Sequence, residues 1–574
     1  MLRQLKRSVL CTFAVTCGFA ALAQNGEVPE VPKGWHLKDK AKDGYYGISM
    51  DKAYELVKGK KSQTVVVAVI DSGIDTLHED LKPVLWKNPK EIPANGIDDD
   101  KNGYIDDVHG WNFLGGKDGR NVTEDSYEVH RVYHRYKDKF SSVSDSSTLS
   151  KEDKEIYAMW KKAEKQVMGS DQATSATELL FLKRTYEGAI KSDSILQKAI
   201  GKEVYTGREL ESFTPTTADA EKAKKGLLFF FTANDIKDES NKSFLESFKQ
   251  YLASEERKAN ASVAAPKNYR AEVVQDNEAD INDRFYGNNN IMVDENSALH
   301  GTHVSGIIAA VRKNGKGMDG VADNVRIMSL RAVPDGDEHD KDIALAIRYA
   351  VDNGAKVINM SFGKSFSPEK NWVDDAVKYA ESKGVLLVHA AGNDAANIDT
   401  VSNYPTPVFK GSTEKASNWI TVGASGDPKA GGVVAPFSNY GKTEVDVFAP
   451  GVKIYATVPG GNTYADLQGT SMASPVVAGT AAFLLSYYPN LTAQQVKYII
   501  ENSATTGIGE VTNPGSGATV SFAQLSKTGG LLNAAEAVRL AEQISGGKNG
   551  IKTATKDKKG TQPSKKETAP VKSF

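Results

Sequence analysis

Runs of hydrophobic residues along this chain predict an alternation of buried strands and helices. Residues 63–70 form a continuous, mostly β-branched run, as expected for a strand that is buried on both faces of a parallel sheet. Shorter runs at 356–360 and 385–389 predict two more strands of this kind. The apolar stretches at 304–311 and 475–485 are long enough for buried helices. The order of these elements indicates an α/β fold with a mostly parallel central sheet flanked by helices.

The segment between residues 116 and 285 has a different pattern, with many charges and with apolar residues at helical spacing. Ser150 resembles a helix N-cap, and three groups of apolar residues each share one helix face. The groups are Ile156, Met159, Trp160, Ala163 and Val167; Leu179, Leu182, Tyr186, Ala189 and Ile190; and Phe244, Phe248, Tyr251 and Leu252. Because such stripes are usually core, this segment is expected to form a small helical subdomain.

The amino terminus predicts export. Residues 1–7 are basic, residues 8–23 are mostly apolar, and Ala21-Leu22-Ala23 has the A-x-A form of a signal-peptide cleavage site. This predicted signal peptide is too short to span a membrane, and no later stretch reaches about 18 apolar residues. We therefore expect a secreted, periplasmic or cell-surface protein without a transmembrane segment.

Both cysteines, Cys11 and Cys17, lie inside the predicted signal peptide. A mature chain without cysteine excludes disulfides and thiol catalysis. A lipid anchor at Cys17 is an alternative, but Thr16 is a bulky neighbour for that processing. At the other end, residues 546–574 are rich in Lys, Thr and Gly and are expected to form a disordered tail.

Length and composition narrow the class of protein. The chain has 574 residues, more than one ordinary domain, and its 40% hydrophobic and 25% charged residues describe a soluble globular protein. The formal net charge of −2 gives no reason to expect nucleic acid or an anionic membrane as a partner. The oligomeric state stays open.

Three polar residues stand where predicted strands end or helices begin. Asp71 ends the first predicted strand, His300 opens a predicted helix, and Ser471 precedes another helix, whose Pro475 suits a first turn. Taken singly, they can be explained as a turn-forming aspartate, a metal pair of His300 with His303, and an N-capping serine. The metal pair has little support, because the chain has no H-E-x-x-H motif and no cysteine to assist.

Together, these residues match the requirements of a serine hydrolase. Hydrolysis of a peptide bond by serine needs a hydroxyl, an imidazole base, a buried carboxylate that orients the base, and donors for the oxyanion. Asp71, His300 and Ser471 supply the first three, and Asn393, after another predicted strand, offers a side-chain N–H. The order Asp, His, Ser along the chain is one of three known for this geometry.

Seven short motifs in a fixed order carry a family resemblance. They are "VVAVIDSGID" (66–75), "HGTHVSG" (300–306), "VINMSFG" (357–363), "AAGN" (390–393), "FSNYG" (437–441), "VFAPG" (447–451) and "GTSMASP" (469–475). Together they resemble the successive motifs of the subtilisin-like serine peptidases, or subtilases, over residues 45–115 and 286–545. The resemblance implies a three-layer subtilisin-like fold in a bacterial secreted enzyme, with a large insertion between the Asp and His motifs.

The resemblance also implies a role for each motif residue. Ser471 is the nucleophile, and its hydroxyl loses its proton to His300 during the attack. His300 later protonates the leaving amine, while Asp71 orients the imidazole. Asn393 matches the oxyanion residue of the family and acts with the backbone N–H of Ser471. His303 is expected to be a structural contact.

Protein or peptide substrates are implied by the same comparison. The strand that pairs with the extended substrate backbone and the pocket for the residue before the cleaved bond are formed by Ser361, Phe362, Gly363, Ala390, Ala391 and Gly392. The small pocket walls leave room for a large apolar side chain. No acidic cluster in these motifs demands Lys or Arg.

An acidic stretch at 95–107 follows the ligand spacing of a calcium loop. Positions 1, 3, 5, 7 and 9 of the pattern are Asp98, Asp100, Asn102, Tyr104 and Asp106. Gly103 permits the sharp turn, but His109 replaces the usual Glu at position 12, so another ligand such as Asp107 has to serve. Asp80 separately matches a calcium ligand of the family. The predicted cofactor is structural Ca²⁺, and the alternative is a polar turn rich in Asx residues.

These observations divide the chain into five parts. They are a signal peptide (1–23), an N-terminal extension (24–61), a peptidase domain (62–115 and 286–545), a helical insertion (116–285) and the tail (546–574). The insertion leaves and re-enters between Asp71 and His300, so we expect it near the catalytic cleft. Many secreted subtilases carry a propeptide before the catalytic domain that assists folding and acts as an intramolecular inhibitor. The roughly 20 residues between the signal peptide and the start of the resemblance are too few for such a domain. We hypothesise that the insertion, or nothing, takes the place of this propeptide.

Three functions are compatible with this sequence. The first is an exported endopeptidase. The second is a non-catalytic relative that binds peptides or glycans, although such proteins usually lack a triad residue or the oxyanion Asn, and all four are present here. The third is an esterase, although no G-x-S-x-G elbow surrounds Ser471.

Overall fold

The structure is a computed structural model that describes residues 31–169, 176–234, 236–237 and 239–546. The predicted signal peptide, both cysteines and the predicted tail beyond Gly546 lie outside the described residues. None of the helices in the described part is long and apolar enough to span a membrane.

An eight-stranded sheet forms the centre of the larger part of the molecule. Its order is β2 (Gly110–Asn112), β3 (Val325–Arg331), β1 (Val65–Asp71), β4 (Val357–Met360), β5 (Leu386–Ala390), β6 (Trp419–Asp427) and β7 (Ala430–Val434), with β8 (Val447–Pro450) also beside β6. All pairings are parallel except that of β6 with β7. The prediction of a mostly parallel sheet is therefore confirmed.

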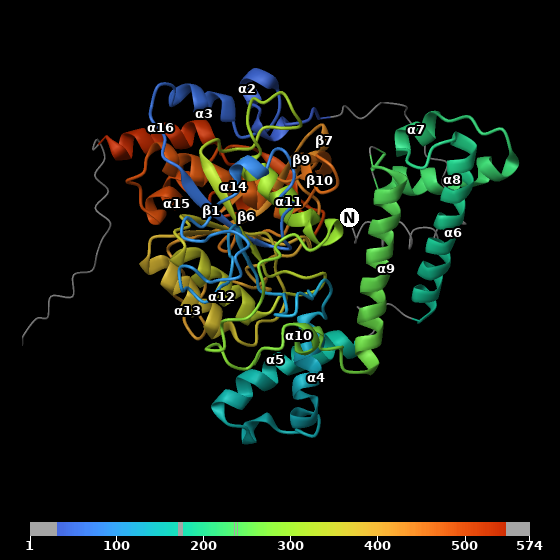
Figure 1. Cartoon of the computed structure of the whole chain (residues 1–574), viewed down its shortest axis with the longest axis horizontal. Helices are drawn as coiled ribbons and strands as arrows, with labels where there is room; N and C mark the ends of the chain where they lie inside the picture. Colours follow the sequence, from blue (N-terminus) through green and yellow to red (C-terminus); the bar gives the residue numbers. More distant parts are fainter. Residues whose placement is uncertain (1–30, 170–175, 235, 238, 547–574) are drawn as a thin grey trace, which may run out of the picture.

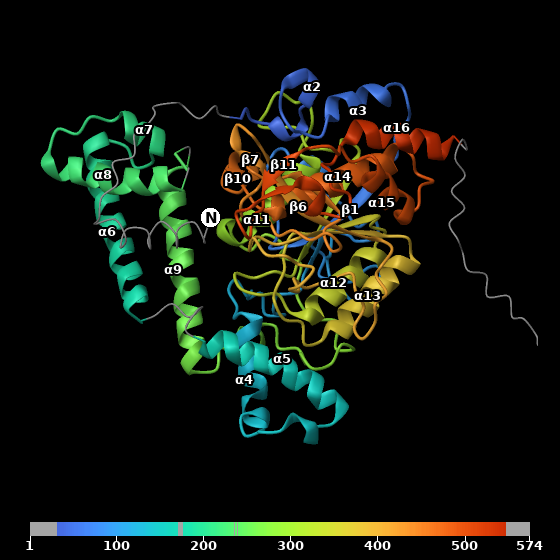
Figure 2. The ribbon, with the colours of Figure 1, turned by 180° about the vertical axis from the view of Figure 1, so that it is seen from behind.

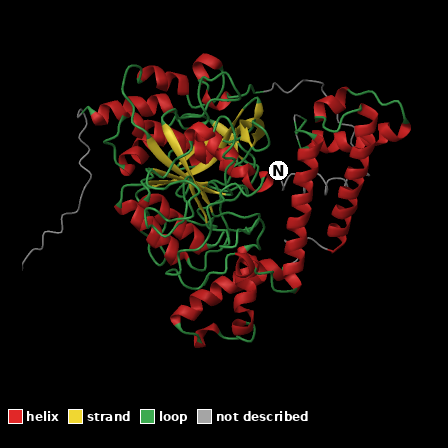
Figure 3. Ribbon diagram, viewed as in Figure 1, coloured by secondary structure: helices red, strands yellow, loops and turns green. Residues whose placement is uncertain are grey.

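Alternate residues of β1 face two separate cores, because side chains of a strand point to opposite faces in turn. Val67 and Val69 pack in one core with α11 (Glu295–Ala309) and α14 (Thr470–Tyr487). Ala68 and Ile70 pack in the other core with α12 (Asp340–Asp352) and α13 (Lys370–Ser382). The fold thus has three layers, with the yellow strands of Figure 3 between two layers of helices; Figure 2 shows α12 and α13 together on one side.

Several further elements pack on the core that contains α14. They are η1 (Trp35–Leu37), α3 (Met50–Leu56), α15 (Ala493–Asn502), α16 (Ala534–Ser545) and the hairpin of β9 (Ile454–Val458) with β10 (Thr463–Leu467). The hairpin of β11 (Glu510–Thr512) with β12 (Thr519–Ser521) packs in a smaller core with η4 (Phe522–Gln524). The remaining short elements are α2 (Lys40–Asp43), η2 (Lys82–Val84) and η3 (Ser146–Thr148). The segment predicted as an N-terminal extension contributes Trp35, Ile48 and Met50 to the main core. The Trp35 indole N–H donates to the carbonyl of Val452 at 3.0 Å.

The insertion is entirely helical in its described regular elements. Its helices are α4 (Glu128–Phe140), α5 (Lys151–Met168), α6 (Ala176–Ile200), α7 (Gly207–Ser212), α8 (Ala218–Ala233), α9 (Asn241–Val263) and α10 (Tyr269–Val273). Ser150 caps α5, as predicted, by accepting a hydrogen bond from the N–H of Asp153 at 3.0 Å.

The insertion has two hydrophobic cores where the sequence predicted one subdomain. Helices α4 and α5 bury Trp160 and Phe140 together with Phe366 of the peptidase domain, whereas α6 to α9 enclose their own core around Phe231, Phe244 and Phe248. Figure 1 shows α6, α7 and α8 standing apart from the sheet, while α4 and α5 lie beneath it.

Periodicity within one helix marks the apolar faces but not the helix against which each face packs. Of the stripe predicted for α6, Leu182 and Ala189 are buried, together with Leu196 further along the helix, whereas Ile190 is 41% exposed.

Candidate active site

The carboxyl end of β1 places an aspartate beside a histidine of α11. Asp71 is the last residue of β1 and is 2% exposed, and its Oδ1 lies 2.7 Å from His300 Nδ1. The other oxygen, Oδ2, is buried without a hydrogen-bond partner among the described residues. Gly301 makes this approach possible, because a Cβ at that position would lie 2.1 Å from the carbonyl oxygen of Gly73.

Helix α11 begins earlier than the sequence predicted. Asp294 caps it by accepting from the N–H of Ser297, so His300 lies in the second turn and not at the start. Desolvation by itself would lower the pKa of His300, but the charge of Asp71 and the hydrogen bond to it outweigh that effect and raise the pKa. The imidazole is thereby strengthened as a base.

The other histidine of the motif has a different environment. His303 is fully buried and its Nε2 lies 3.1 Å from the carbonyl oxygen of Ala465. Burial lowers the pKa of His303 to about 3, so its ring is neutral. This is the structural contact that the sequence predicted.

Ser471 lies in the first turn of α14, where backbone N–H groups have no acceptor within the helix. Its Oγ donates to the carbonyl of Ser361 at 3.0 Å, and no hydrogen bond to His300 is present among the described residues. The Ser471 hydroxyl is thus directed toward Ser361 and not toward the imidazole. Helices α11 and α14 pack against each other, which keeps the two residues on one face of the sheet.

Pro475 lies deeper in α14 than predicted, as its sixth residue and beyond the first turn. Proline has no N–H to offer to the carbonyl of Ser471 four residues earlier. That carbonyl instead accepts a hydrogen bond from Ser361 Oγ at 3.0 Å. Ser361 and Ser471 are consequently joined by two reciprocal hydrogen bonds.

Asn393 is oriented by the residue before the serine. Its Oδ1 accepts from the backbone N–H of Thr470 at 2.8 Å and from the Thr470 hydroxyl at 3.0 Å. With the oxygen occupied in this way, Nδ2 is the part of the amide left to donate to a ligand. A Cβ at Gly469 would lie 3.5 Å from Asn393 Nδ2 and 3.6 Å from the backbone nitrogen of Ser471, so both groups border the same glycine. Thr470 was not recognised from the sequence, although it stands within the GTSMASP motif.

The residues predicted to form the substrate strand and pocket stand directly after β4 and at the end of β5. Ser361, Ala390 and Ala391 are buried. Asn403 Nδ2 donates to the carbonyls of Ala390 and Ala391 at 3.2 and 3.0 Å, and Asn439 Nδ2 donates to Ala391 at 2.8 Å. These two asparagines were missed as supporting residues, although Asn439 belongs to the FSNYG motif.

Three side chains converge at the acidic loop. One carboxylate oxygen each from Glu91, Asp98 and Asp100 lies within 4.8 Å of the other two. Glu91 was missed, because it precedes the loop pattern by seven positions. Oxygen ligands of this kind fit Ca²⁺, and converging negative charges favour a cation between them.

The other predicted metal ligands lie outside this group. Asn102 Nδ2 donates to Asp107, and Asp106 accepts from the N–H groups of Asn95 and Gly96. The ring of Tyr104 is 8% exposed and packs against aromatic neighbours, so only its backbone carbonyl is suited to bind a metal.

Asp80 lies apart from the acidic loop, next to the β9–β10 hairpin. Its two carboxylate oxygens accept from Asn314 Nδ2 at 2.5 Å and from the hydroxyl of Tyr464 at 2.7 Å. Both oxygens are thus occupied by neutral donors.

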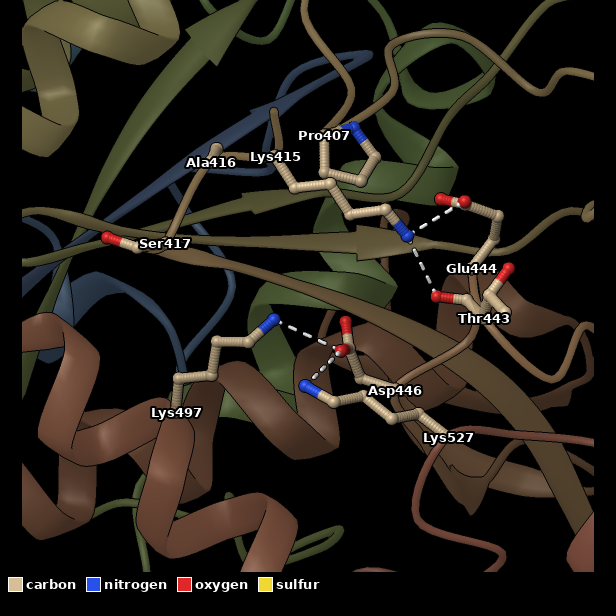
Figure 4. Close-up of a pocket in the computed structure, with 9 residues that line it drawn as sticks. All are labelled: Pro407, Lys415, Ala416, Ser417, Thr443, Glu444, Asp446, Lys497 and Lys527. Atoms are coloured by element: carbon tan, nitrogen blue, oxygen red, sulfur yellow. Dashed lines mark hydrogen bonds and ion pairs between the residues drawn. The ribbon is translucent and has the colours of Figure 1, made fainter. Parts of the chain in front are cut away.

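A separate cavity of about 280 Å³ contains several lysines, shown in Figure 4. Lys497 and Lys527 both contact Asp446, at 3.0 and 3.7 Å, and Lys415 contacts Glu444 at 2.8 Å. The positive charges are already balanced by carboxylates, and none of the predicted site residues lines the cavity.

Comparison with known proteins adds an independent line of argument. A family model described as the subtilase family matches residues 62–524. The chain is 44% identical over 206 residues to a thermophilic serine proteinase of Bacillus sp. (strain AK1). The aligned part is 36% of this chain and 46% of that protein. It is 40% identical over 208 residues to subtilisin DY of Bacillus licheniformis (36% and 70%) and 39% identical over 238 residues to thermitase of Thermoactinomyces vulgaris (40% and 77%). The chain thus spans about half of the first relative and over two thirds of the other two.

Proposed function

The chain belongs to the subtilase family of serine endopeptidases, and on this premise we propose that it hydrolyses peptide bonds with Asp71, His300 and Ser471 as its triad. The observation that carries the proposal is the 2.7 Å contact between His300 Nδ1 and Asp71 Oδ1 at the carboxyl end of β1. A carboxylate in this position fixes the ring so that Nε2 is free to accept a proton.

The reaction proceeds in two halves. Ser471 Oγ rotates away from Ser361, gives its proton to His300 Nε2 and attacks the substrate carbonyl carbon. The carbonyl oxygen, now negative, accepts hydrogen bonds from Asn393 Nδ2 and the backbone N–H of Ser471. The C–N bond then breaks, and the imidazolium gives its proton to the leaving amine.

Water completes the turnover. It loses a proton to His300 and attacks the acyl carbon, and the C–O bond to Ser471 breaks as the serine takes that proton back. The strand of Ser361, Phe362 and Gly363 binds the extended substrate, and Ala390, Ala391 and Gly392 line the pocket of the residue before the cleaved bond.

Two further properties belong to the proposal. Export to the periplasm, the cell surface or the medium is supported by the basic and apolar leader with its A-x-A site. A structural Ca²⁺ ion held by Glu91, Asp98 and Asp100 is supported by their convergence, and the ion would stabilise the acidic loop. Chelation should lower the melting temperature of the wild type, but should have little effect on the double variant D98N/D100N.

Labelling of the active serine tests the central claim. A fluorophosphonate probe should label the wild type, and Ser471→Ala should abolish both labelling and casein hydrolysis while the fold is kept. A well-folded wild type that is neither labelled nor active would favour the binding-protein alternative. Hydrolysis of esters without any peptide-bond cleavage would favour the esterase alternative.

A further inference from the structure

The segment that follows β4 presents its backbone groups alternately to two sides. The carbonyl of Ser361 accepts from Ser471, whereas the carbonyl of Phe362 accepts from His389 Nε2 at 2.9 Å. Lys364 pairs with Tyr404 through both of its backbone groups, at 3.0 and 2.8 Å. Because successive residues of an extended chain point in opposite directions, Gly363 faces the same side as Ser361.

The edge available to a substrate is therefore the one formed by Ser361 and Gly363. No hydrogen bond to the backbone of Gly363 is present in the described part of the chain. Residues i and i+2 of a strand are about 6.6 Å apart. If the residue before the cleaved bond lies beside Ser361, the peptide residue two positions closer to the amino terminus therefore lies beside Gly363. The next residue of the segment, Lys364, faces the opposite side, and its pairing with Tyr404 there anchors the segment just beyond Gly363.

The side chain of Lys364 ties the end of this edge to the insertion. It is 2% exposed, and its Nζ lies 2.8 Å from Glu128 Oε2 and 2.9 Å from Asp340 Oδ1. It also donates to the carbonyl of Glu338 at 2.8 Å. Glu128 is the first residue of α4, so the partner that the insertion supplies is held at the start of a helix.

Glu128 is itself fixed by several contacts. Its Oε2 accepts from Arg131 Nη2 at 2.7 Å, and its backbone N–H donates to Asp337 Oδ2 at 2.8 Å. Arg131 continues the network to the carbonyl of Glu338 at 3.0 Å. Burial alone would raise the pKa of Glu128, but the charges of Arg131 and Lys364 outweigh it and hold the pKa well below its ordinary value. The carboxylate is therefore ionised within a buried network.

We infer that Glu128 is a positioning residue for extended substrates, because it holds Lys364 and thereby fixes the edge formed by Ser361 and Gly363. This inference rests on the proposed peptidase function. The insertion then determines how strongly the enzyme prefers peptides with at least three residues on the amino side of the cleaved bond. Peptides that end beside Ser361 do not reach the part of the edge that Lys364 fixes.

A pair of chromogenic substrates measures this preference in the full-length protein. The substrates are acetyl-Phe-p-nitroanilide and acetyl-Ala-Ala-Phe-p-nitroanilide, and the readout is the ratio of their kcat/KM values. Both values come from one sample, so a loss of folded enzyme cancels in the ratio. In the wild type the longer substrate should be favoured, and Glu128→Gln should reduce the ratio about tenfold, chiefly through KM.

Two further variants keep the test decisive. Glu128→Asp retains the charge but shortens its reach, so it should give an intermediate ratio even if Glu128→Gln does not fold. Asp193→Asn is the matched control, because Asp193 is a buried carboxylate of the insertion that contacts Tyr205 and Asn241 and not the substrate strand. It should leave the ratio unchanged.

The outcomes separate the two claims. A wild-type ratio near one, or variants of Glu128 with the wild-type ratio, would overturn the inference while the enzyme is still a peptidase. A wild type that cleaves neither substrate and does not react with a fluorophosphonate would overturn the proposed function instead.

Discussion

The catalytic edge and the joint of the insertion are held together in different ways. The catalytic edge comprises the residues of the proposed active site, Asp71, His300, Asn393 and Ser471. The joint comprises residues 125–131 and 270–278 of the insertion together with residues 335–342 and Lys364 of the peptidase domain. Around the catalytic edge, apart from the Asp71–His300 pair, the supporting contacts described above are neutral, from Thr470, Asn403, Asn439 and Ser361. The joint uses buried charges.

Arg270 is an example of the buried charges that hold the joint. It is 2% exposed and contacts Asp276 at 2.7 Å and Asp342 at 2.5 Å, and Lys341 approaches Asp276 at 2.6 Å. Buried charges are costly unless every partner is in place, so the loss of one partner of this network is expected to destabilise the joint. A reacting centre has the opposite requirement. In the proposed mechanism the Asp71–His300 pair changes protonation during turnover, and further fixed charges close to it would shift the pKa of His300.

The largest effect should follow from Asp71→Asn, which damages the catalytic edge alone. The amide leaves the geometry intact but no longer favours the correct tautomer and the charged form of His300, so kcat should fall by about 10⁴. The melting temperature should change little.

The pH profile gives a second readout of this variant. The base must be neutral to act, so activity is lost as pH falls through the pKa of His300, which Asp71 raises. In Asp71→Asn the acidic limb should move to lower pH. A limb at the wild-type position would show that another group controls it.

Removal of a charge from the joint should affect stability more than chemistry. Arg270→Met leaves Asp276 and Asp342 buried without their partner, and the free energy of unfolding should fall by about 3–5 kcal/mol. Urea denaturation followed by fluorescence measures the loss. Arg539→Met is the control, because the exposed pair of Arg539 with Glu536 is worth at most about 1 kcal/mol. Equal losses in the two variants would contradict the contrast between joint and surface.

Asn393→Ala should lower kcat by about 10²–10³, because one of two donors to the oxyanion is removed. KM should change little, since the donor acts mainly in the transition state. Steady-state kinetics on a single peptide substrate measures both. A rise in KM with an unchanged kcat would place Asn393 in substrate binding instead.

The smallest effect concerns His339, whose ring nitrogens lie 3.1 Å from Asp125 and 2.9 Å from Glu278. Burial and the charge of Arg131 lower the pKa of His339, but these two carboxylates outweigh them and raise it. The stabilisation of the folded state by these two ion pairs is thus complete below about pH 6.5 and is lost as pH rises through the raised pKa of His339. The melting temperature of the wild type should fall across this pH range, and this contribution should be absent in His339→Gln. The same slope in both proteins would exclude His339 as its source.

The elements that carry the proposed catalytic residues could be predicted, because most of these residues stand at local signals in the sequence. Asp71 and Asn393 follow buried strands, and Ser471 precedes a buried helix, so the ends of elements read from hydrophobic patterns already bring them to one side of the sheet. The exact start of α11 was not predicted, because the cap at Asp294 lies before the apolar run that marked the helix.

The joint could not be predicted in the same way. Glu128 and Lys364 are separated by 236 positions, and hydrophobic periodicity carries no information about which charges pair. For the same reason the apolar stripes of the insertion did not reveal that α4 and α5 share Phe366 with the peptidase domain, while α6 to α9 form a core of their own. The contribution of Glu91 to the acidic loop was likewise outside the recognised pattern.

Pro475 limits how this enzyme can be made more robust by design. By helix propensity alone, Pro475→Ala looks attractive, since proline in a helix interior is about 3 kcal/mol less favourable than alanine. The alanine N–H would, however, compete for the very carbonyl of Ser471 that Ser361 now binds. Pro475→Ala is therefore expected to weaken the bond between the Ser361 hydroxyl and the Ser471 carbonyl, so that a gain in the stability of α14 is opposed by a looser placement of the proposed nucleophile.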